Sequence, residues 1–335
     1  MARHVYLVVT DLHLYYKNLS SRKNYLAELD VARNKIEELC EKYDRPTILF
    51  LGDIFHSGYQ SVTQAISDIS WFGKLKEITS GLYTVVGNHE LSYTKSNPFY
   101  GLICGVESSK LPISSKVFGH HGMVNVVDEL IDGDTRFVFN HYGTEIDTDT
   151  FDGVKIGLFH QDLVTAQVEA DSDIQVYGDR LEDTSVFSSY DYAFLGHIHS
   201  VYGLYREGRT FVDYLGSLGR TNVTEVNDKN RERDIPAVII EDNQFSRIER
   251  NQFLLPSRAE SVIEESVIAN HEAYEKRKVL HEVRDMRIGN EDSIDNVRVM
   301  LKDYGGTALA IVDSAAEGKL GDLWRSVRPG GMYGF

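Results

Sequence analysis

TILFLGDIFH, residues 47–56, places a short apolar run directly before a Gly-Asp pair and a histidine. A run of this length that ends at a turn signal is typical of a strand buried on both faces of a sheet. The same arrangement occurs twice more nearby. VYLVVT at 5–10 precedes Asp-Leu-His, and LYTVV at 82–86 precedes Gly-Asn-His-Glu. We therefore predict three buried strands, each ending in side chains that can bind cations.

Amphipathic segments at 21–43 and 62–78 separate these strands, and each repeats apolar residues at helical spacing. The order strand–helix–strand–helix–strand predicts a layered α/β fold. From about residue 111 short strand-like runs dominate, which predicts a second sheet. These runs cover 136–140, 154–159, 192–195, 201–205, 210–215 and 237–241.

The bulk composition favours a folded globular chain, with 42% hydrophobic and 26% charged residues. A net charge of −16 argues against a surface that binds polyanions over the whole molecule, although a partner or metal ions could supply a local positive field. Cys40 and Cys104 are too few for a disulfide framework, which favours a reducing compartment. Because there is neither a leader-like segment nor an apolar run of about 18 residues, we expect a cytoplasmic protein without a membrane span.

The composition shifts after Pro256, where a charged stretch at 258–286 carries apolar residues at roughly helical spacing. We predict a main domain over 1–255 and a small capping or partner-binding region over 256–335. The stretch at 258–286 fits a partner-binding helix and an ordinary solvated helix about equally well.

Five predicted strand ends carry aspartate, asparagine or histidine, and ligands gather at the C-terminal ends of strands in open α/β sheets. These side chains bind divalent transition metals such as Mn²⁺, Fe²⁺ or Zn²⁺. Each motif alone also fits a turn or a helix cap, so it is their joint occurrence that indicates a site. Seven candidates are too many for one tetrahedral ion and suit two ions about 3.5–4 Å apart, with one carboxylate shared. The candidates are Asp11, His13, Asp53, Asn88, His160, His197 and His199.

The order D-x-H, G-D, G-N-H-E, H, G-H-x-H resembles that of the calcineurin-like metallophosphoesterase superfamily. The resemblance implies a four-layer αββα sandwich with a two-metal site, in which Asp53 bridges the ions. It also implies that His89 is a catalytic histidine, which stabilises the transition state or protonates the leaving oxygen. By matching position, one ion is held by Asp11, His13, Asp53 and His199, and the other by Asp53, Asn88, His160 and His197.

Within the superfamily, the chain is similar to SbcD-like DNA repair exonucleases over roughly residues 4–255. The stretches that carry this likeness are DLHLYYK at 11–17, DYAFLGHIHSVYG at 191–203 and YLGSLGRTNVTE at 214–225. Ser/Thr protein phosphatases continue their second motif as G-D-x-V-D-R-G. Here GDIFHSG at 52–58 has no arginine, so the grip on a phosphomonoester is missing from its expected place.

This likeness implies a compact, phage-type DNA nuclease, an exonuclease with endonuclease activity, which serves a coiled-coil SbcC-like ATPase in recombination and repair. Mn²⁺ is the expected metal, with Mg²⁺, Fe²⁺ or Zn²⁺ as alternatives. The likeness further implies a homodimer and, if the chain is phage-encoded, a location in the host cytoplasm. The helix at 62–78, with Trp71, Phe72 and Leu75, is a candidate dimer surface, although each of these residues fits ordinary core packing better. His56 would orient the DNA, and basic residues would contact its phosphates: Lys17, Arg22, Lys23 and Arg220.

Two other functions stay open. One is a phosphomonoesterase or nucleotide phosphodiesterase that acts on a small molecule or a phosphoprotein with the same metal core. The other is a non-catalytic scaffold that kept the fold. The absent arginine disfavours the protein phosphatase, and the complete set of seven ligand candidates disfavours the scaffold.

Overall fold

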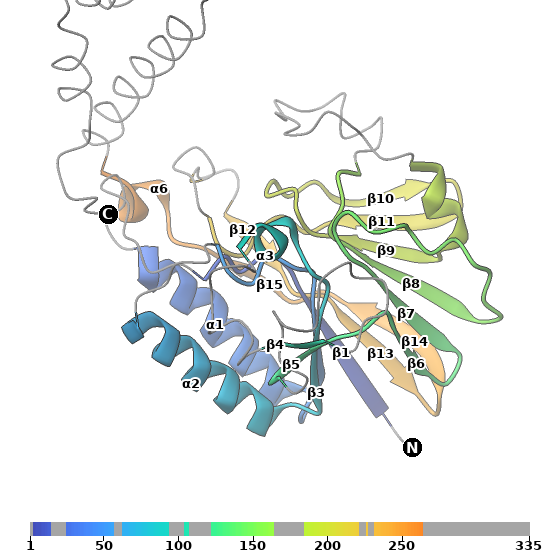
Figure 1. The fold of residues 1–335 in the computed structure, drawn as a ribbon, viewed down its shortest axis with the longest axis horizontal. Helices are drawn as coiled ribbons and strands as arrows, with labels where there is room; N and C mark the ends of the chain where they lie inside the picture. The colour runs from blue at the N-terminus through green and yellow to red at the C-terminus, as the bar shows by residue number, and fades with distance from the viewer. Residues whose placement is uncertain are drawn as a thin grey trace, which may run out of the picture. The chain divides into compact units, whose positions relative to one another are not determined.

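The computed structural model describes residues 3–14, 25–56, 62–93, 104–106, 122–163, 184–220, 226 and 231–263 (Figure 1). Almost all of them belong to one compact unit made of residues 1–19 and 24–261. Of the predicted helix at 258–286, the structure describes residues 258–263, of which α6 (Arg258–Ser261) is helical and 262–263 are not. The domain boundary at 256 and the role of 256–335 therefore stay predictions.

The first sheet is built around the three strands that the sequence predicts. Strands β1 (Arg3–Val9), β2 (Thr47–Phe50) and β3 (Gly81–Thr84) lie side by side and run parallel. The sheet has seven strands in the order β14-β13-β1-β2-β3-β5-β4. Its other strands are β4 (Cys104–Val106), β5 (Val124–Val126), β13 (Ala237–Glu241) and β14 (Gln244–Glu249).

Helices α1 (Tyr25–Lys42) and α2 (Val62–Ile78) cover one face of this sheet (Figure 1). Alternate residues of a strand point to opposite faces, and β1 shows the consequence. Leu7 packs in the core shared with the helices, whereas Val8 packs in the core on the other face. Both faces of β1 are thus buried, as its unbroken apolar run predicts.

The second sheet supplies the other wall of that far core. It has six strands in the order β10-β11-β9-β8-β7-β6. Phe137, Ile156 and Phe194 of this sheet pack against Tyr6 and Val8 of the first. The strands are β6 (Glu129–Asp132), β7 (Thr135–Asn140), β8 (Val154–Phe159), β9 (Tyr192–Leu195), β10 (Gly203–Glu207) and β11 (Thr210–Tyr214).

The predicted layered α/β fold with two large sheets is confirmed. The strand-like run at 237–241, expected in the second sheet, instead forms β13 of the first sheet, where it pairs antiparallel with β1. Among the described residues, the outer core of the second sheet includes the 3-10 helix η1 (Thr184–Ser189). A small two-stranded sheet joins β12 (Glu232–Asp234) to β15 (Gln252–Leu254). No helix in the described part of the chain is long and apolar enough to cross a membrane.

The C-terminal ends of the central strands determine where the site forms. Strands β7, β8, β9 and β11 are parallel neighbours, like β1, β2 and β3 in the other sheet. The loops after β1 and β2 join through a parallel bridge between Leu14 and Phe55. The loops after β8 and β9 lie against the loops after β1 and β2, because His160 contacts Leu51 and the backbone of His197 contacts Asp11.

Candidate metal centre

Asp11 is fully buried at the end of β1, and both its carboxylate and its carbonyl are engaged. The backbone N–H of His197 donates to Asp11 Oδ1 at 3.0 Å and Oδ2 at 3.2 Å. The Asp11 carbonyl accepts the N–H groups of Leu218 and Gly219 at 3.0 and 3.1 Å. These contacts hold the carboxylate in one orientation towards the other candidate ligands.

Three of the predicted ligands have left-handed backbone conformations, which non-glycine residues seldom adopt. The φ angles are 46° at His13, 44° at Asp53 and 71° at His197. Such conformations cost of order 1–3 kcal/mol each and persist only where the surroundings enforce them. Here the enforcement is visible, since the N–H of His13 donates to the Asp53 carbonyl at 2.9 Å. Three of the seven left-handed non-glycine residues in the described part of the chain are thus predicted ligands.

A first group of donors consists of Asp11, His13 and His199, whose ligand atoms all lie within 4.8 Å of one another. His13 Nε2 lies 2.8 Å from His199 Nε2 and 3.8 Å from Asp53 Oδ2. Burial, reinforced by His199, holds the pKa of His13 well below its usual value. His13 is therefore a neutral imidazole with a lone pair ready for a cation.

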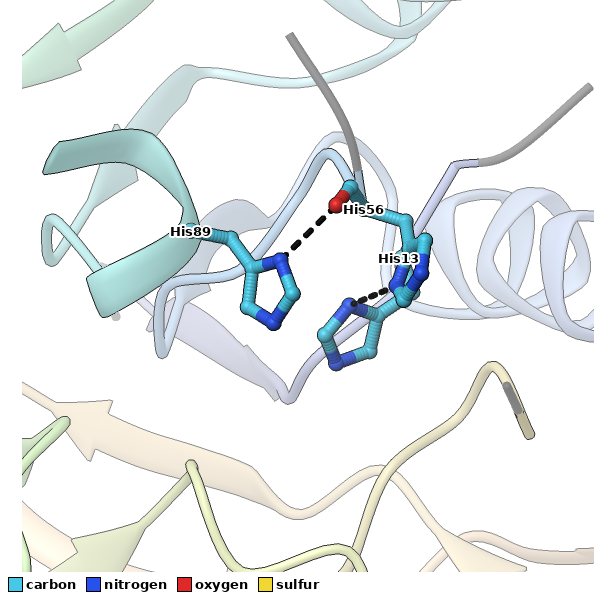
Figure 2. Close-up of side chains that lie close together, drawn as sticks. All are labelled: His13, His56 and His89. Atoms are coloured by element: carbon cyan, nitrogen blue, oxygen red, sulfur yellow. Dashed lines mark hydrogen bonds between the residues drawn. The ribbon is translucent and has the colours of Figure 1, made fainter. Parts of the chain in front are cut away.

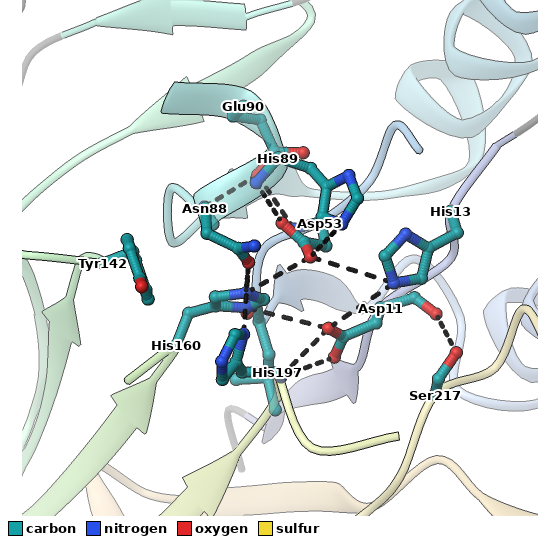
Figure 3. Close-up of polar contacts among 12 residues, drawn as sticks. Asp11, His13, Asp53, Asn88, His89, Glu90, Tyr142, His160, His197 and Ser217 are labelled. Atoms are coloured by element: carbon teal, nitrogen blue, oxygen red, sulfur yellow. Dashed lines mark hydrogen bonds and ion pairs between the residues drawn. The ribbon is translucent and has the colours of Figure 1, made fainter. Parts of the chain in front are cut away.

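A second group consists of Asp53, His160 and His197, whose ligand atoms likewise lie within 4.8 Å of one another. His160 Nε2 lies 3.4 Å from Asp53 Oδ2. Asn88, at the start of α3 (Asn88–Tyr93), joins this group. Its Oδ1 lies 3.0 Å from His160 Nε2 and 3.1 Å from His197 Nδ1 (Figure 3).

Asp53 Oδ2 lies 3.8 Å from His13 Nε2 of the first group and 3.4 Å from His160 Nε2 of its own group, as the predicted bridging role requires. Burial disfavours charge on His160, but the carboxylates of Asp53 and Asp11 outweigh it and raise the pKa of His160 to about 10. Nitrogen and oxygen donors that face one another in a buried cluster suit borderline divalent cations. The residues thus fit two ions, and the predicted ligands of both come together.

His89 and His56 lie beside His13 (Figure 2). His89 Nδ1 donates to the His56 carbonyl at 2.8 Å, which leaves Nε2 facing Asp53 Oδ2 at 3.8 Å. His56 Nδ1 lies 3.4 Å from His13 Nδ1. Ligand atoms of His13, His56 and His89 also fall within 4.8 Å of one another.

Glu90 is a further buried residue of the site, and sequence reasoning assigned it no role. Its Oε2 accepts the N–H groups of Asp53 and Gly87 at 2.9 and 2.7 Å, and its Oε1 accepts that of Phe55 at 3.3 Å. Burial, reinforced by the charge of Asp53, raises the pKa of Glu90 to about 8. Glu90 therefore fixes the backbone from which Asp53 projects.

Asp162 and Tyr142 were also missed. Asp162 Oδ1 accepts a hydrogen bond from His197 Nε2 at 2.7 Å, and its Oδ2 accepts one from the Tyr142 hydroxyl at 3.3 Å. The only available signal was the spacing of Asp162 two residues after His160. That spacing does not reveal a contact with His197.

Gly87 and Gly196 of the motifs lie so close to other site atoms that no side chain would fit at either position. A Cβ on Gly87 would lie 2.1 Å from Asp53 Oδ1, and one on Gly196 would lie 2.7 Å from Asp11 Oδ2 and 2.8 Å from the Leu51 carbonyl. All of these distances are shorter than real Cβ contacts allow. Gly-Asn-His and Gly-His-x-His therefore need glycine because a ligand carboxylate occupies the space of its side chain.

Of the four predicted DNA contacts, the structure describes only Arg220. Lys17, Arg22 and Lys23 lie outside the described residues. The prediction that Arg220 contacts DNA is wrong, because Arg220 is fully buried, pairs with Glu28 and donates to the Pro256 carbonyl at 2.9 Å. An arginine enclosed in this way supports the fold and is not presented to phosphates.

Comparison with known proteins gives one family. The model of the calcineurin-like phosphoesterases matches residues 4–201, more than half of the chain. No curated protein matches the chain.

Among the similar solved structures are two with TM-scores of 0.40. NAD nucleotidase of Haemophilus influenzae is 12% identical, and the match covers 76% of this chain and 50% of that one. A hypothetical protein from Thermus thermophilus is 10% identical, with 76% and 100% covered. The present chain thus spans about half the length of the NAD nucleotidase.

Proposed function

The chain belongs to the calcineurin-like phosphoesterase family, and from this membership we propose that it is a two-metal nuclease that hydrolyses phosphodiester bonds of DNA. Family membership makes the chain a metal-dependent phosphoesterase. The choice of DNA, of the SbcD-like branch and of Mn²⁺ is the proposal.

The observation that carries the proposal is the identity of the side chains around the Asp53 carboxylate. They are His13, His89 and His160, all with Nε2 within 3.8 Å of Asp53 Oδ2. Where related phosphatases have an arginine that grips a dianionic monoester, GDIFHSG supplies His56. A phosphodiester carries a single negative charge and needs no such grip.

His89 is suited to handle a proton in this reaction. Its Nδ1–H is bound to the His56 carbonyl, so Nε2 is the atom that faces the substrate side. The side chain is 24% exposed, whereas His13 and His160 are fully buried. A proton held at His89 Nε2 can be passed to the leaving oxygen.

The ions, when bound, would clamp and polarise the phosphate and activate the attacking water. Asp11, His13, Asp53 and His199 would hold one ion, and Asp53, Asn88, His160 and His197 the other. Mn²⁺ suits this mixture of carboxylate, amide and imidazole donors, and so do Fe²⁺ and Zn²⁺. His56 would orient the phosphate from beside His13 and His89.

The partners of the proposal are DNA, a second copy of the chain and an SbcC-like coiled-coil ATPase. The net charge of −16 supports a nuclease subunit that depends on a partner for much of its DNA affinity. Residues 256–335 are the proposed partner-binding region. Lys17, Arg22 and Lys23 are the proposed basic contacts with the backbone.

One assay tests the activity. The purified chain with Mn²⁺ is offered linear DNA, bis-p-nitrophenyl phosphate and p-nitrophenyl phosphate in parallel, with an Asp53→Asn variant as the blank. We expect the first two substrates to be hydrolysed and the monoester to be spared. Hydrolysis confined to the monoester would overturn the proposal in favour of a phosphomonoesterase.

A further inference from the structure

The hydrogen bond between His197 and Asp162 has a direction that the chemistry of the two groups imposes. A carboxylate only accepts, so His197 Nε2 donates the hydrogen bond of 2.7 Å to Asp162 Oδ1. A neutral imidazole has one N–H, and its place at Nε2 leaves the lone pair at Nδ1. Nδ1 is the atom that lies 3.1 Å from Asn88 Oδ1, within the second group of donors (Figure 3).

We propose that Asp162 is a positioning residue, which fixes the tautomer and ring orientation of His197 so that Nδ1 faces the second cation. The inference rests on the proposed role of His197 as a ligand. Groups that hold the second nitrogen of a metal-binding histidine commonly contribute to affinity, which falls by about 10- to 100-fold when they are removed.

The ring of His197 needs a side-chain partner to hold its orientation more than the ring of His160 does. His160 is fully buried, and its Nδ1 donates to the Leu51 carbonyl at 2.7 Å, so the backbone fixes its ring. The side chain of His197 is 17% exposed and projects from a residue with a left-handed backbone. Among the described residues, Asp162 is the acceptor that holds its Nε2.

Asp162 is itself oriented by Tyr142. The tyrosine hydroxyl donates to Oδ2, so the two carboxylate oxygens have different partners. The Tyr142 ring also lies 5.5 Å from the His197 ring, centroid to centroid. Tyr142 is held in turn by its backbone N–H, which donates to the Val86 carbonyl at 2.9 Å. The two hydrogen bonds that join Tyr142, Asp162 and His197 thus link the loops after β7, β8 and β9.

The test measures metal binding and the tautomer rather than turnover. Mn²⁺ is titrated into the full-length chain by calorimetry, and nitrogen NMR of the imidazoles is recorded on the metal-free protein. In Asp162→Ala we expect the second ion to bind about 10- to 100-fold more weakly and His197 to populate both tautomers. Asp162→Asn, which keeps an acceptor, should recover part of both losses, and Tyr142→Phe should show a smaller loss.

The chain offers a matched control in Asp132, which holds His4 Nδ1 at 2.6 Å at the surface. Asp132→Ala should leave the affinity for both ions unchanged. His197→Ala tests whether His197 is a ligand, independently of the role of Asp162. If it weakens the second site while Asp162→Ala does not, the positioning role is wrong. If neither variant changes metal binding, the assignment of His197 as a ligand fails, and the two-metal proposal fails with it.

Discussion

The carboxylate of Glu90 lies directly behind Asp53 and accepts its backbone N–H at 2.9 Å. The central candidate ligand is thus held by a second carboxyl group, whose own oxygens accept backbone N–H groups. Burial and, next, the nearby charge of Asp53 disfavour ionisation of Glu90 and raise its pKa to about 8. This arrangement makes the stability of the metal-free protein depend on pH.

The folded-state pKa of Glu90 lies above its ordinary value of 4.5, so between those pH values the folded protein binds more protons than the unfolded chain. The contribution of Glu90 to stability is therefore largest below about pH 4.5 and decreases as the pH rises towards 8. We expect the free energy of unfolding, measured by urea titration with a chelator present, to decrease over this range. In Glu90→Gln, which does not ionise, the decrease should be shallower. Equal slopes in the two proteins would contradict this account.

Metal binding should release a proton from His160. The pKa of about 10 means that this imidazole is protonated in the metal-free protein at neutral pH, whereas a ligand must be neutral. Binding at the second group should strengthen by about tenfold per pH unit below 10. His13 is already neutral, so it should release none. Calorimetry in two buffers of different ionisation enthalpy measures the number of protons released. A count of zero at about pH 7 would show that His160 is already neutral there.

His89→Ala should lose hydrolysis and keep its ions. We expect the rate to fall by about 10²- to 10⁴-fold, the usual contribution of a positioned proton donor. Calorimetric binding of Mn²⁺ should stay close to native, because His89 belongs to neither predicted ligand set. Asp53→Ala is the contrast, and it should lose both binding and hydrolysis. Near-native turnover by His89→Ala would falsify the catalytic role.

A methyl group at Gly196 should disturb the centre more than the fold. The added Cβ would lie 2.7 Å from Asp11 Oδ2 and 3.2 Å from His160 Nδ1, one ligand from each group. We expect Gly196→Ala to weaken binding of both ions by at least about tenfold. Gly73→Ala is the matched control, because its Cβ would meet no atom within 4 Å. In helix α2 that change should stabilise the protein by about 0.5–1 kcal/mol. Native metal affinity in Gly196→Ala would show that the carboxylate of Asp11 is free to move.

Much of the site could be predicted because its ligands follow strands that are recognisable one at a time. The apolar run of β2 predicts a buried strand, and parallel neighbours carry their next residues to a common edge. Asp53 and His160 therefore meet although 106 residues separate them, as their numbers show. The sequence also shows a glycine directly before His197. Why glycine is required there, namely that Asp11 takes the space of a side chain at Gly196, is visible only in three dimensions.

The supporting contacts could not be predicted, because they depend on which loops become neighbours. Asp162 holds His197 only because β8 and β9 are adjacent strands of one sheet. Arg220 was expected at the surface because charged residues usually lie there. Its partner Glu28 lies far away in the sequence, and no local pattern indicates that pair.

Both sheets contribute donors to the centre, since Asp53 follows β2 and His197 follows β9. A cation held by both would tie the two halves of the sandwich together, and by mass action it would deplete the open states that proteases attack. The resistance of this chain to digestion should thus rise and fall with the supply of divalent ions. Metal availability would then set how long the protein persists as well as how fast it works.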